Sequence, residues 1–228
     1  MIVLNPEWEY GVAIDTGYFT AAVWGAVDFY GNMIVYRSYL AENKIVAEHS
    51  KEFLSYQAID GVLPTYVIDP GSQVKLEYIA NGIYCIDGDN SVDAGNNYVS
   101  SLMRIDKDKP VGLEWNNPQL LILSDGEGND KLLRQMRNYR RRDVRGVVKD
   151  DRQREKIRKV DDHLCDALRY LCMAKLFPQK RWRQGVVGSK LASRVSPHIE
   201  HIRGMARNLR NGNSRWESPY DFQLGVDY

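Results

Sequence analysis

The 228-residue sequence contains no Gly-Lys pair, so it lacks the G-x-x-x-x-G-K-[ST] pattern of a phosphate-binding P-loop. No apolar run approaches the roughly 20 residues that a membrane-spanning helix needs. The first ten residues, MIVLNPEWEY, have no basic start followed by an apolar stretch, so we expect no signal peptide. The three cysteines, Cys85, Cys165 and Cys172, show no C-x-x-C spacing. This favours a reducing compartment and argues against a zinc site.

Positive charge is scarce in the first part of the chain. Residues 1–130 hold 7 Lys or Arg against 19 Asp or Glu, a net charge of −12, whereas residues 131–159 hold 13 against 4, a net charge of +9. The formal net charge of +1 hides this segregation. An acidic body with one dense basic stretch predicts a polyanionic partner held beside a carboxylate-rich site. The alternative is that the basic stretch forms a solvated helix face.

The spacing of apolar residues and turn formers predicts the order of the elements. Strands are expected at 10–16, 20–28 and 33–40, as a meander whose second turn lies at Gly31-Asn32. They are followed by a helix over 45–59, a strand ending at Asp69, a helix over 73–82, a strand over 83–87, a helix over 92–105, a strand over 118–125 and helices over 129–141 and 160–177. The expected fold class is α/β, with a mixed sheet of three antiparallel strands and then parallel strands, flanked by helices.

The composition divides the chain into a predicted domain, residues 1–177, and a basic tail, residues 178–228. The tail holds 9 Lys or Arg against 4 Asp or Glu and is rich in Arg, Gly, Asn and Ser. Within it, HIEHIRGMARNLR (residues 198–210) places its apolar residues roughly on one helical stripe. Two interpretations stay open: an amphipathic helix that docks on a partner, and a disordered arm.

Two apolar strands each end in an aspartate, Asp15 and Asp69. A strand–helix–strand unit returns its second strand parallel to the sheet, and open α/β sheets bind ligands at the carboxyl ends of their strands. If these two strands are neighbours, both carboxylates lie at the same edge of the sheet. A divalent cation would then remove their mutual repulsion. The alternative is that both residues only form turns, because Asp-Thr-Gly and Asp-Pro-Gly are good turn sequences.

The last predicted helix places three further polar side chains beside its buried face. At about 100° per residue, its apolar residues form one stripe, namely Val160, Leu164, Ala167, Leu168 and Leu171. Asp162, His163 and Asp166 lie along an adjacent edge. An isolated carboxylate next to a packed stripe is costly unless it is paired or metal-bound. The plain alternative for Asp166 is a pair with Arg169, and for Asp162 a favourable place at the helix N-terminus.

Three stretches, AIDTGYFTAAVWGAV, YVIDPG and KVDDHLCDALRY, together resemble the nuclease domain of the large terminase subunit of tailed bacteriophages. The resemblance covers about residues 8–177, and its most specific part is the pattern D-H-x-x-D-A-x-R-Y near the end of the domain. It implies a ribonuclease H-like fold and an endonuclease that cuts concatemeric viral DNA during genome packaging with two divalent metal ions.

The resemblance also implies which residues bind these ions. Asp15, Asp69 and Asp166 match the family's acidic positions, with Asp15 bridging both ions. His163 matches a histidine that some members use as a ligand. Asp162 is a further candidate, because members differ in which acidic residue of this helix reaches the metal. Carboxylate ligands favour Mg²⁺ or Mn²⁺, and a histidine ligand shifts the preference towards Mn²⁺.

Double-stranded DNA is the partner that both the charge pattern and the resemblance imply. We expect six basic residues to contact its phosphates, namely Arg137, Arg140, Arg141, Arg142, Arg145 and Lys149. By resemblance, further partners are the portal protein, the small terminase subunit and a terminase ATPase domain, and the location is the host cell cytoplasm at the procapsid. The ATPase is expected outside this chain because there is no P-loop. An excised nuclease domain and a separate motor chain both fit, and the abrupt start favours the first.

Four other classes share parts of the pattern. An aspartic protease needs a second Asp-Thr-Gly and has no use for H-x-x-D on a helix, and an actin-like ATPase needs further phosphate and adenosine motifs that are not visible. A Holliday-junction resolvase or another ribonuclease H-like nuclease shares all the metal chemistry. A non-catalytic module that binds DNA or the portal protein is disfavoured by the intact Asp15, Asp69 and Asp166.

Overall fold

The computed structural model describes residues 4–139 and 161–174. It opens with the predicted meander of three antiparallel strands, β1 (Glu9–Asp15), β2 (Phe19–Val27) and β3 (Met33–Glu42). The turn between β2 and β3 is closed by Asp28, whose carboxylate accepts hydrogen bonds from the backbone of Tyr30 and Asn32 and from the Asn32 side chain. Gly31 adopts a left-handed φ of 85° there, which glycine takes without steric cost.

The remaining elements follow in the expected order. They are α1 (Val46–Asp60), β4 (Thr65–Ile68), α2 (Lys75–Ala80), β5 (Cys85–Asp87), α3 (Val92–Met103), the 3₁₀ turn η1 (Leu113–Trp115), β6 (Leu120–Glu127), α4 (Asn129–Asn138) and α5 (His163–Met173). The sheet has the order β5-β4-β1-β2-β3-β6, and β4, β5 and β6 join it in parallel. The predicted fold class is confirmed. The turn η1 was not predicted, and α4 ends earlier than expected.

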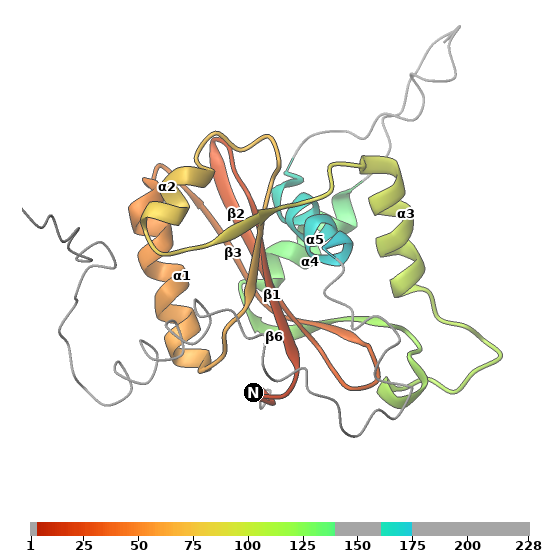
Figure 1. Ribbon diagram of the computed structural model, residues 1–228. Coiled ribbons are helices and arrows are strands. Elements are labelled where there is room, and N and C mark those ends of the chain that lie inside the picture. Colours follow the sequence, from red (N-terminus) through yellow and green to blue (C-terminus); the bar gives the residue numbers. More distant parts are fainter. Residues whose placement is uncertain (1–3, 140–160, 175–228) are drawn as a thin grey trace, which may run out of the picture. The chain divides into compact units, whose positions relative to one another are not determined.

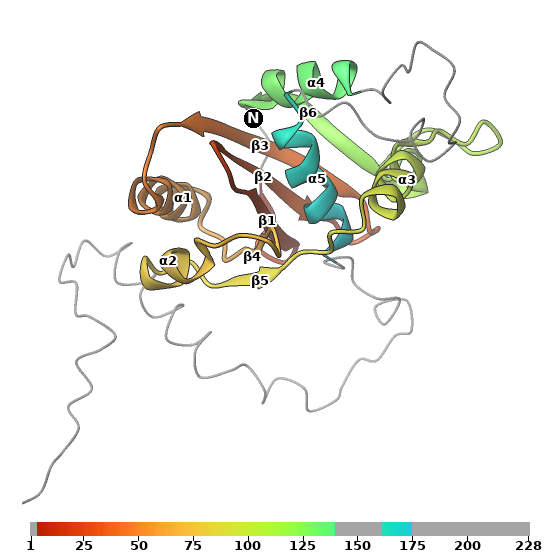
Figure 2. The ribbon, with the colours of Figure 1, turned by 90° about the horizontal axis from the view of Figure 1, so that it is seen from above.

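Helices cover both faces of the sheet (Figure 2), and each face has its own apolar core. On one face α1 and α2 pack over aromatic side chains, with Trp24 in edge-to-face contact with Phe53 at 5.2 Å. On the other face α5 lies between α3 and α4, and its Leu164, Leu168 and Leu171 are buried against the sheet. The part of the predicted α5 stripe that the structure describes is therefore confirmed.

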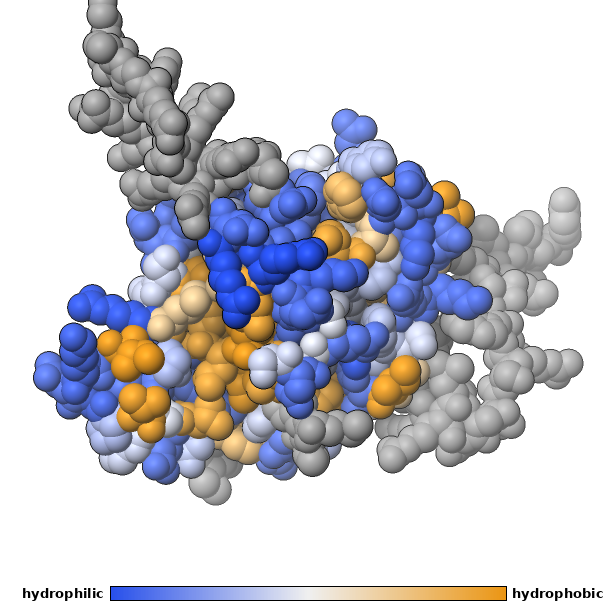
Figure 3. All heavy atoms as spheres, turned by 180° about the vertical axis from the view of Figure 1, so that it is seen from behind, coloured by the Kyte–Doolittle hydropathy of each residue, from blue (hydrophilic) through white to orange (hydrophobic). Residues whose placement is uncertain are grey.

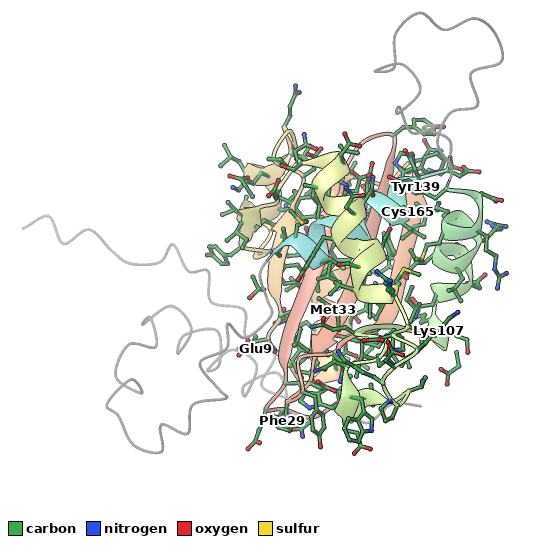
Figure 4. All side chains as sticks on the ribbon, turned by 90° about the vertical axis from the view of Figure 1, so that its right-hand side faces the viewer. Glu9, Phe29, Met33, Lys107, Tyr139 and Cys165 are labelled. Carbon is green, nitrogen blue, oxygen red and sulfur yellow. The ribbon has the colours of Figure 1, made fainter. Side chains whose placement is uncertain are left out.

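Five of the six strands end at the same edge of the sheet, because β1, β3, β4, β5 and β6 run in one direction. β1 and β4 are direct neighbours, with Ile14 opposite Ile68. The predicted neighbourhood of these strands is thus confirmed, and Asp15 and Asp69 leave the sheet side by side. Figure 1 shows this edge at the top, where the first turn of α5 also lies. In Figure 4, Cys165 of α5 and Tyr139 lie at this end, far from Phe29 at the other.

Two buried polar side chains of α4 attach it to the sheet and to α5. Asn129 is fully buried at the first position of α4, where it accepts a hydrogen bond from Ser38 Oγ at 2.5 Å and donates to the Leu123 carbonyl at 2.8 Å. One and a half turns later, Gln135 Oε1 accepts the Leu164 backbone N–H at 2.8 Å. This N–H lies in the first turn of α5 and has no partner within its own helix. Gln135 therefore helps to set where α5 begins.

The largest exposed apolar side chains near the opposite edge belong to the β2–β3 turn and to η1. They include Phe29, Tyr30, Leu113 and Trp115, and Asn32 Nδ2 donates to the Leu113 carbonyl at 2.7 Å to join the two segments. Figure 3 shows the face behind the view of Figure 1, where hydrophilic side chains surround an apolar area left of its centre. Across residues 4–139 and 161–174, no helix is long and apolar enough to cross a membrane.

Candidate active site

Asp15 is the last residue of β1, and its side chain faces α5. Side chains alternate along a strand, so Ala13 and Asp15 share the α5 face whereas Ile14 faces α1 and α2. Asp15 is 9% exposed, and its Oδ2 lies 3.1 Å from His163 Nδ1, at the first position of α5. Phe19, the first residue of β2, packs its ring 5.2 Å from the His163 ring. The structure thus brings together two of the predicted site residues.

Burial raises the pKa of Asp15 to about 6. The hydrogen bond from His163 opposes this effect, and the negative charges of Asp166 and Asp69 add to it. The charges of Asp166 and Asp69 act on Asp15, so the three carboxylates lie at the same edge of the sheet. The sequence could indicate each residue separately, but only the fold brings the charges of Asp69 and Asp166 to act on Asp15.

Asp69 follows β4 directly and is held in place by backbone and side-chain contacts. Its N–H donates to the Ile14 carbonyl at 3.0 Å, which extends the β1–β4 ladder to the two aspartates. Its Oδ1 accepts the Gly71 N–H at 3.1 Å, so the residue also forms the turn that its Asp-Pro-Gly sequence suggested. The turn and site interpretations are therefore compatible at Asp69. Thr16 Oγ1 donates to Ser72 Oγ at 2.9 Å and links the turns after β1 and β4.

Asp166 lies in the first turn of α5 and pairs with Arg169. The Nε and Nη2 atoms of Arg169 lie 3.3 and 3.2 Å from Asp166 Oδ1. The guanidinium is buried, with the whole residue 1% exposed. The plain alternative for Asp166, a pair one turn along the helix, is thus observed. This pairing does not remove Asp166 from the site, because the charge of Asp166 still contributes to the raised pKa of Asp15.

Asp162 is the N-cap residue of α5, and its carbonyl accepts the Asp166 N–H at 2.9 Å. Burial raises the pKa of the Cys165 thiol to about 12, and the charges of Asp166 and Asp162 add to this shift. Asp162, like Asp166, therefore lies near enough to Cys165 for its charge to act on that thiol. Its neighbour Asp161 has a left-handed φ of 51°.

The donor set of this edge fits a hard divalent cation. Three carboxylates and one imidazole are ligands that Mg²⁺ and Mn²⁺ accept in proteins, and a cation would offset the negative charges that, after burial, raise the Asp15 pKa. Among residues 4–139 and 161–174, no group of three or more His, Cys, Asp or Glu side chains is arranged so that it could hold a metal ion. Each carboxylate instead contacts a protein partner, which is His163, Tyr170 or Arg169.

Five of the six predicted DNA-contacting residues lie outside the described residues, namely Arg140, Arg141, Arg142, Arg145 and Lys149, as does the tail over 178–228. Arg137 is described. It is exposed in the last turn of α4, where a cation is favourable beside the negative end of the helix dipole.

Sequence reasoning missed several residues that build the site. Tyr170 donates from its hydroxyl to Asp69 Oδ1 at 3.1 Å, and burial raises its pKa to about 12, so it stays a donor at neutral pH. The neighbouring Arg169 was considered only as a partner of Asp166. For Tyr170 and Arg169, the one signal in the sequence was the final Arg-Tyr of the D-H-x-x-D-A-x-R-Y pattern. Gln135 carried none, because its role depends on a contact between distant segments.

A mixed six-stranded sheet with carboxylates at its common strand ends and a helix laid across them defines an α/β protein with a ribonuclease H-like fold. Solved structures of phage large terminases and of their nuclease domains share this fold. The nuclease domain of the bacteriophage P22 large terminase matches 76% of this chain over 84% of its own length, with 16% sequence identity and a TM-score of 0.58.

Two large terminase structures also match the chain. The large terminase of a thermophilic bacteriophage in complex with ADP matches with 20% identity and a TM-score of 0.56, covering 77% of this chain and 42% of that one. The bacteriophage HK97 large terminase matches with 12% identity and a TM-score of 0.50, covering 76% and 40%. This chain therefore spans about two fifths of these two proteins. At such identities the likeness establishes the fold. No protein-family model and no curated protein sequence matches the chain.

Proposed function

We propose that this chain is a metal-dependent endonuclease that cuts double-stranded viral DNA during genome packaging. The observation that supports it most is the convergence of Asp15, Asp69 and Asp166 at the carboxyl edge of a fold shared with terminase nuclease domains. In this proposal its partners are DNA, a terminase ATPase domain, the portal protein and the small terminase subunit. Its place is the host cytoplasm at the procapsid.

The site residues divide the work of holding two Mg²⁺ or Mn²⁺ ions. Asp15 is central, since the charges of both other carboxylates act on it, and it would be a ligand of the ions. Asp69 and Asp166 would each complete one side, and His163 and Asp162 are additional ligand candidates. When bound, such a pair of ions supplies an activated water and stabilises the leaving oxygen of a phosphodiester. His163, already bonded to Asp15, orients that carboxylate.

The basic residues would hold the duplex by its phosphates. Arg137 presents its charge on the exposed side of α4, and the sequence continues from there into the dense basic stretch. Phosphate contacts position DNA without reading its sequence, so we expect binding to depend on salt and little on base sequence. The acidic body, with a net charge of −12 over residues 1–130 (7 Lys or Arg against 19 Asp or Glu), would repel DNA elsewhere on the molecule.

A plasmid-cleavage assay tests the proposal. We expect nicking and linearisation with Mn²⁺ or Mg²⁺, none with EDTA, and none in the Asp15→Asn variant. Ca²⁺ should bind without supporting turnover. Activity that persists in EDTA would refute metal-assisted hydrolysis. A preference for four-way junctions over linear duplex would favour the resolvase class.

One observation favours a second candidate, a non-catalytic DNA-binding or portal-binding module. Asp166 is already paired with the buried Arg169, as in a structural ion pair. Such a module would retain duplex binding and show no cleavage with any divalent cation. The same plasmid assay, combined with a binding titration on linear duplex, therefore separates the two functions.

A further inference from the structure

Tyr170 and Arg169 are consecutive residues of α5, and each contacts a different site carboxylate. The Tyr170 hydroxyl donates to Asp69 Oδ1 at 3.1 Å, whereas two nitrogens of Arg169 converge on Asp166 Oδ1. Within the described residues, the side-chain hydrogen bonds that these two carboxylates accept all fall on Oδ1. One oxygen of each carboxylate is thus held by protein groups.

Both side chains are themselves held by the loop that follows β5. Arg169 Nη1 donates to the Asp89 carbonyl at 3.2 Å, and the Tyr170 hydroxyl lies 3.3 Å from Asn90 Oδ1. The guanidinium stacks over the Tyr170 ring, with its Cζ 4.3 Å from the ring centroid. These contacts fix the rotamers of both residues, so neither is a mobile surface side chain.

Two glycines make room for this pair. A Cβ at Gly95 of α3 would lie 2.6 Å from Arg169 Cγ, and a Cβ at Gly88 would lie 2.9 Å from the Tyr170 ring and 3.2 Å from the Ile68 carbonyl. Distances under 3.0 Å are essentially never seen for real Cβ atoms, and 3.2 Å is tighter than an ordinary contact. The backbones of the β5 loop and of α3 therefore approach α5 as closely as they can at the positions of Arg169 and Tyr170.

We propose that Tyr170 and Arg169 are positioning residues of the metal centre, an inference that rests on the proposed function. Each holds one oxygen of a carboxylate and leaves the second oxygen to bind a divalent cation. Neither touches DNA or metal itself. Partners of this kind fix the direction of a ligand, and their loss typically weakens metal binding about 10- to 100-fold.

The test is a calorimetric titration with Mn²⁺ alone, on the full chain without DNA. Tyr170→Phe removes one hydroxyl and keeps the ring that packs in the core. The matched control is Tyr66→Phe in β4, which also loses one buried hydroxyl bond, to Gln57 at 3.2 Å, on the opposite face of the sheet. We expect the Mn²⁺ Kd to rise about tenfold in Tyr170→Phe and to stay unchanged in Tyr66→Phe.

A second variant, Arg169→Lys, keeps the positive charge but cannot span Asp166 and the Asp89 carbonyl together. It should lower Mn²⁺ affinity in the same direction. In cleavage assays Tyr170→Phe should lower kcat at fixed Mn²⁺ and leave the KM for DNA unchanged, which a merely structural role would not produce. Because Arg169 is buried, its variant can fail to fold, and Tyr170→Phe then decides alone.

The possible outcomes distinguish the positioning role of Tyr170 and Arg169 from the proposed nuclease function. Mn²⁺ affinity that is equal in Tyr170→Phe, Tyr66→Phe and the unmodified protein would overturn the positioning role and leave the proposed function intact. An unmodified protein that neither binds Mn²⁺ nor cleaves DNA would overturn both. A tenfold loss confined to Tyr170→Phe would support both.

Discussion

Replacing Asp15 by Asn should stabilise the metal-free protein at neutral pH. The pKa of Asp15 is raised from 3.8 to about 6, first by burial and further by the charges of Asp166 and Asp69. A raised carboxyl pKa means that the folded state binds the proton more tightly than the unfolded state does. The carboxylate therefore destabilises the fold wherever it is ionised. Two pKa units correspond to about 3 kcal/mol.

The pH dependence of this effect has a definite sign. Below the unfolded pKa both states are protonated, so the variant and the unmodified protein should be equally stable. Between about pH 4 and 6 the unmodified protein loses stability relative to Asp15→Asn, and above that range the difference is constant. Since Asn keeps part of the hydrogen bond to His163, we expect a gain of about 1–3 kcal/mol at pH 7.5, or about 2–4 °C in Tm per kcal/mol.

Thermal unfolding followed by circular dichroism at pH 4.5 and 7.5, with EDTA, measures this difference. Asp108→Asn is the charge-matched control, because Asp108 is exposed in the loop before β6 at the other edge of the sheet. Added Mn²⁺ at about 100 times its Kd should stabilise the unmodified protein by about 2.7 kcal/mol and should affect Asp15→Asn less. A variant that is less stable than the unmodified protein at pH 7.5 without metal would refute the repulsion argument.

Three further predictions concern α5, α4 and the basic stretch. In the plasmid assay, Asp166→Ala should reduce cleavage more than His163→Ala, and Asp161→Ala should leave cleavage nearly unchanged. Loss of activity only in Asp161→Ala would mean that the wrong face of α5 is assigned to the site. Asn129→Ala should lower the free energy of unfolding by about 2–4 kcal/mol in urea titrations, because it leaves buried backbone and hydroxyl groups without partners. A change below about 1 kcal/mol would contradict this role of Asn129. Replacing the arginines at 140–142 by Ala should lower the log–log salt slope of DNA binding by about 0.9 per lost phosphate contact, and an unchanged slope would make the stretch a solvated face.

Much of the fold could be predicted because it is encoded in local patterns. Apolar runs that end in turn formers located β1, β2 and β3, and the stripe of α5 followed from a period of 3.6 residues. The place of β6 beside β3, at the far edge from β4 and β5, was not predictable in the same way. It depends on pairing between residues about 87 positions apart, such as Met33 and Leu120, and no local pattern specifies such a register.

The sequence by itself determined that carboxylates stand where β1 and β4 end and that Asp166 lies beside the buried stripe of α5. These facts depend on residue order and on helical or strand periodicity alone. Only the tertiary structure decided which groups hold each carboxylate. His163 contacts Asp15, and Tyr170 donates a hydrogen bond to Asp69. Long-range packing of α5 on the sheet sets these contacts. The electrostatic coupling of the site therefore exists only in the folded chain.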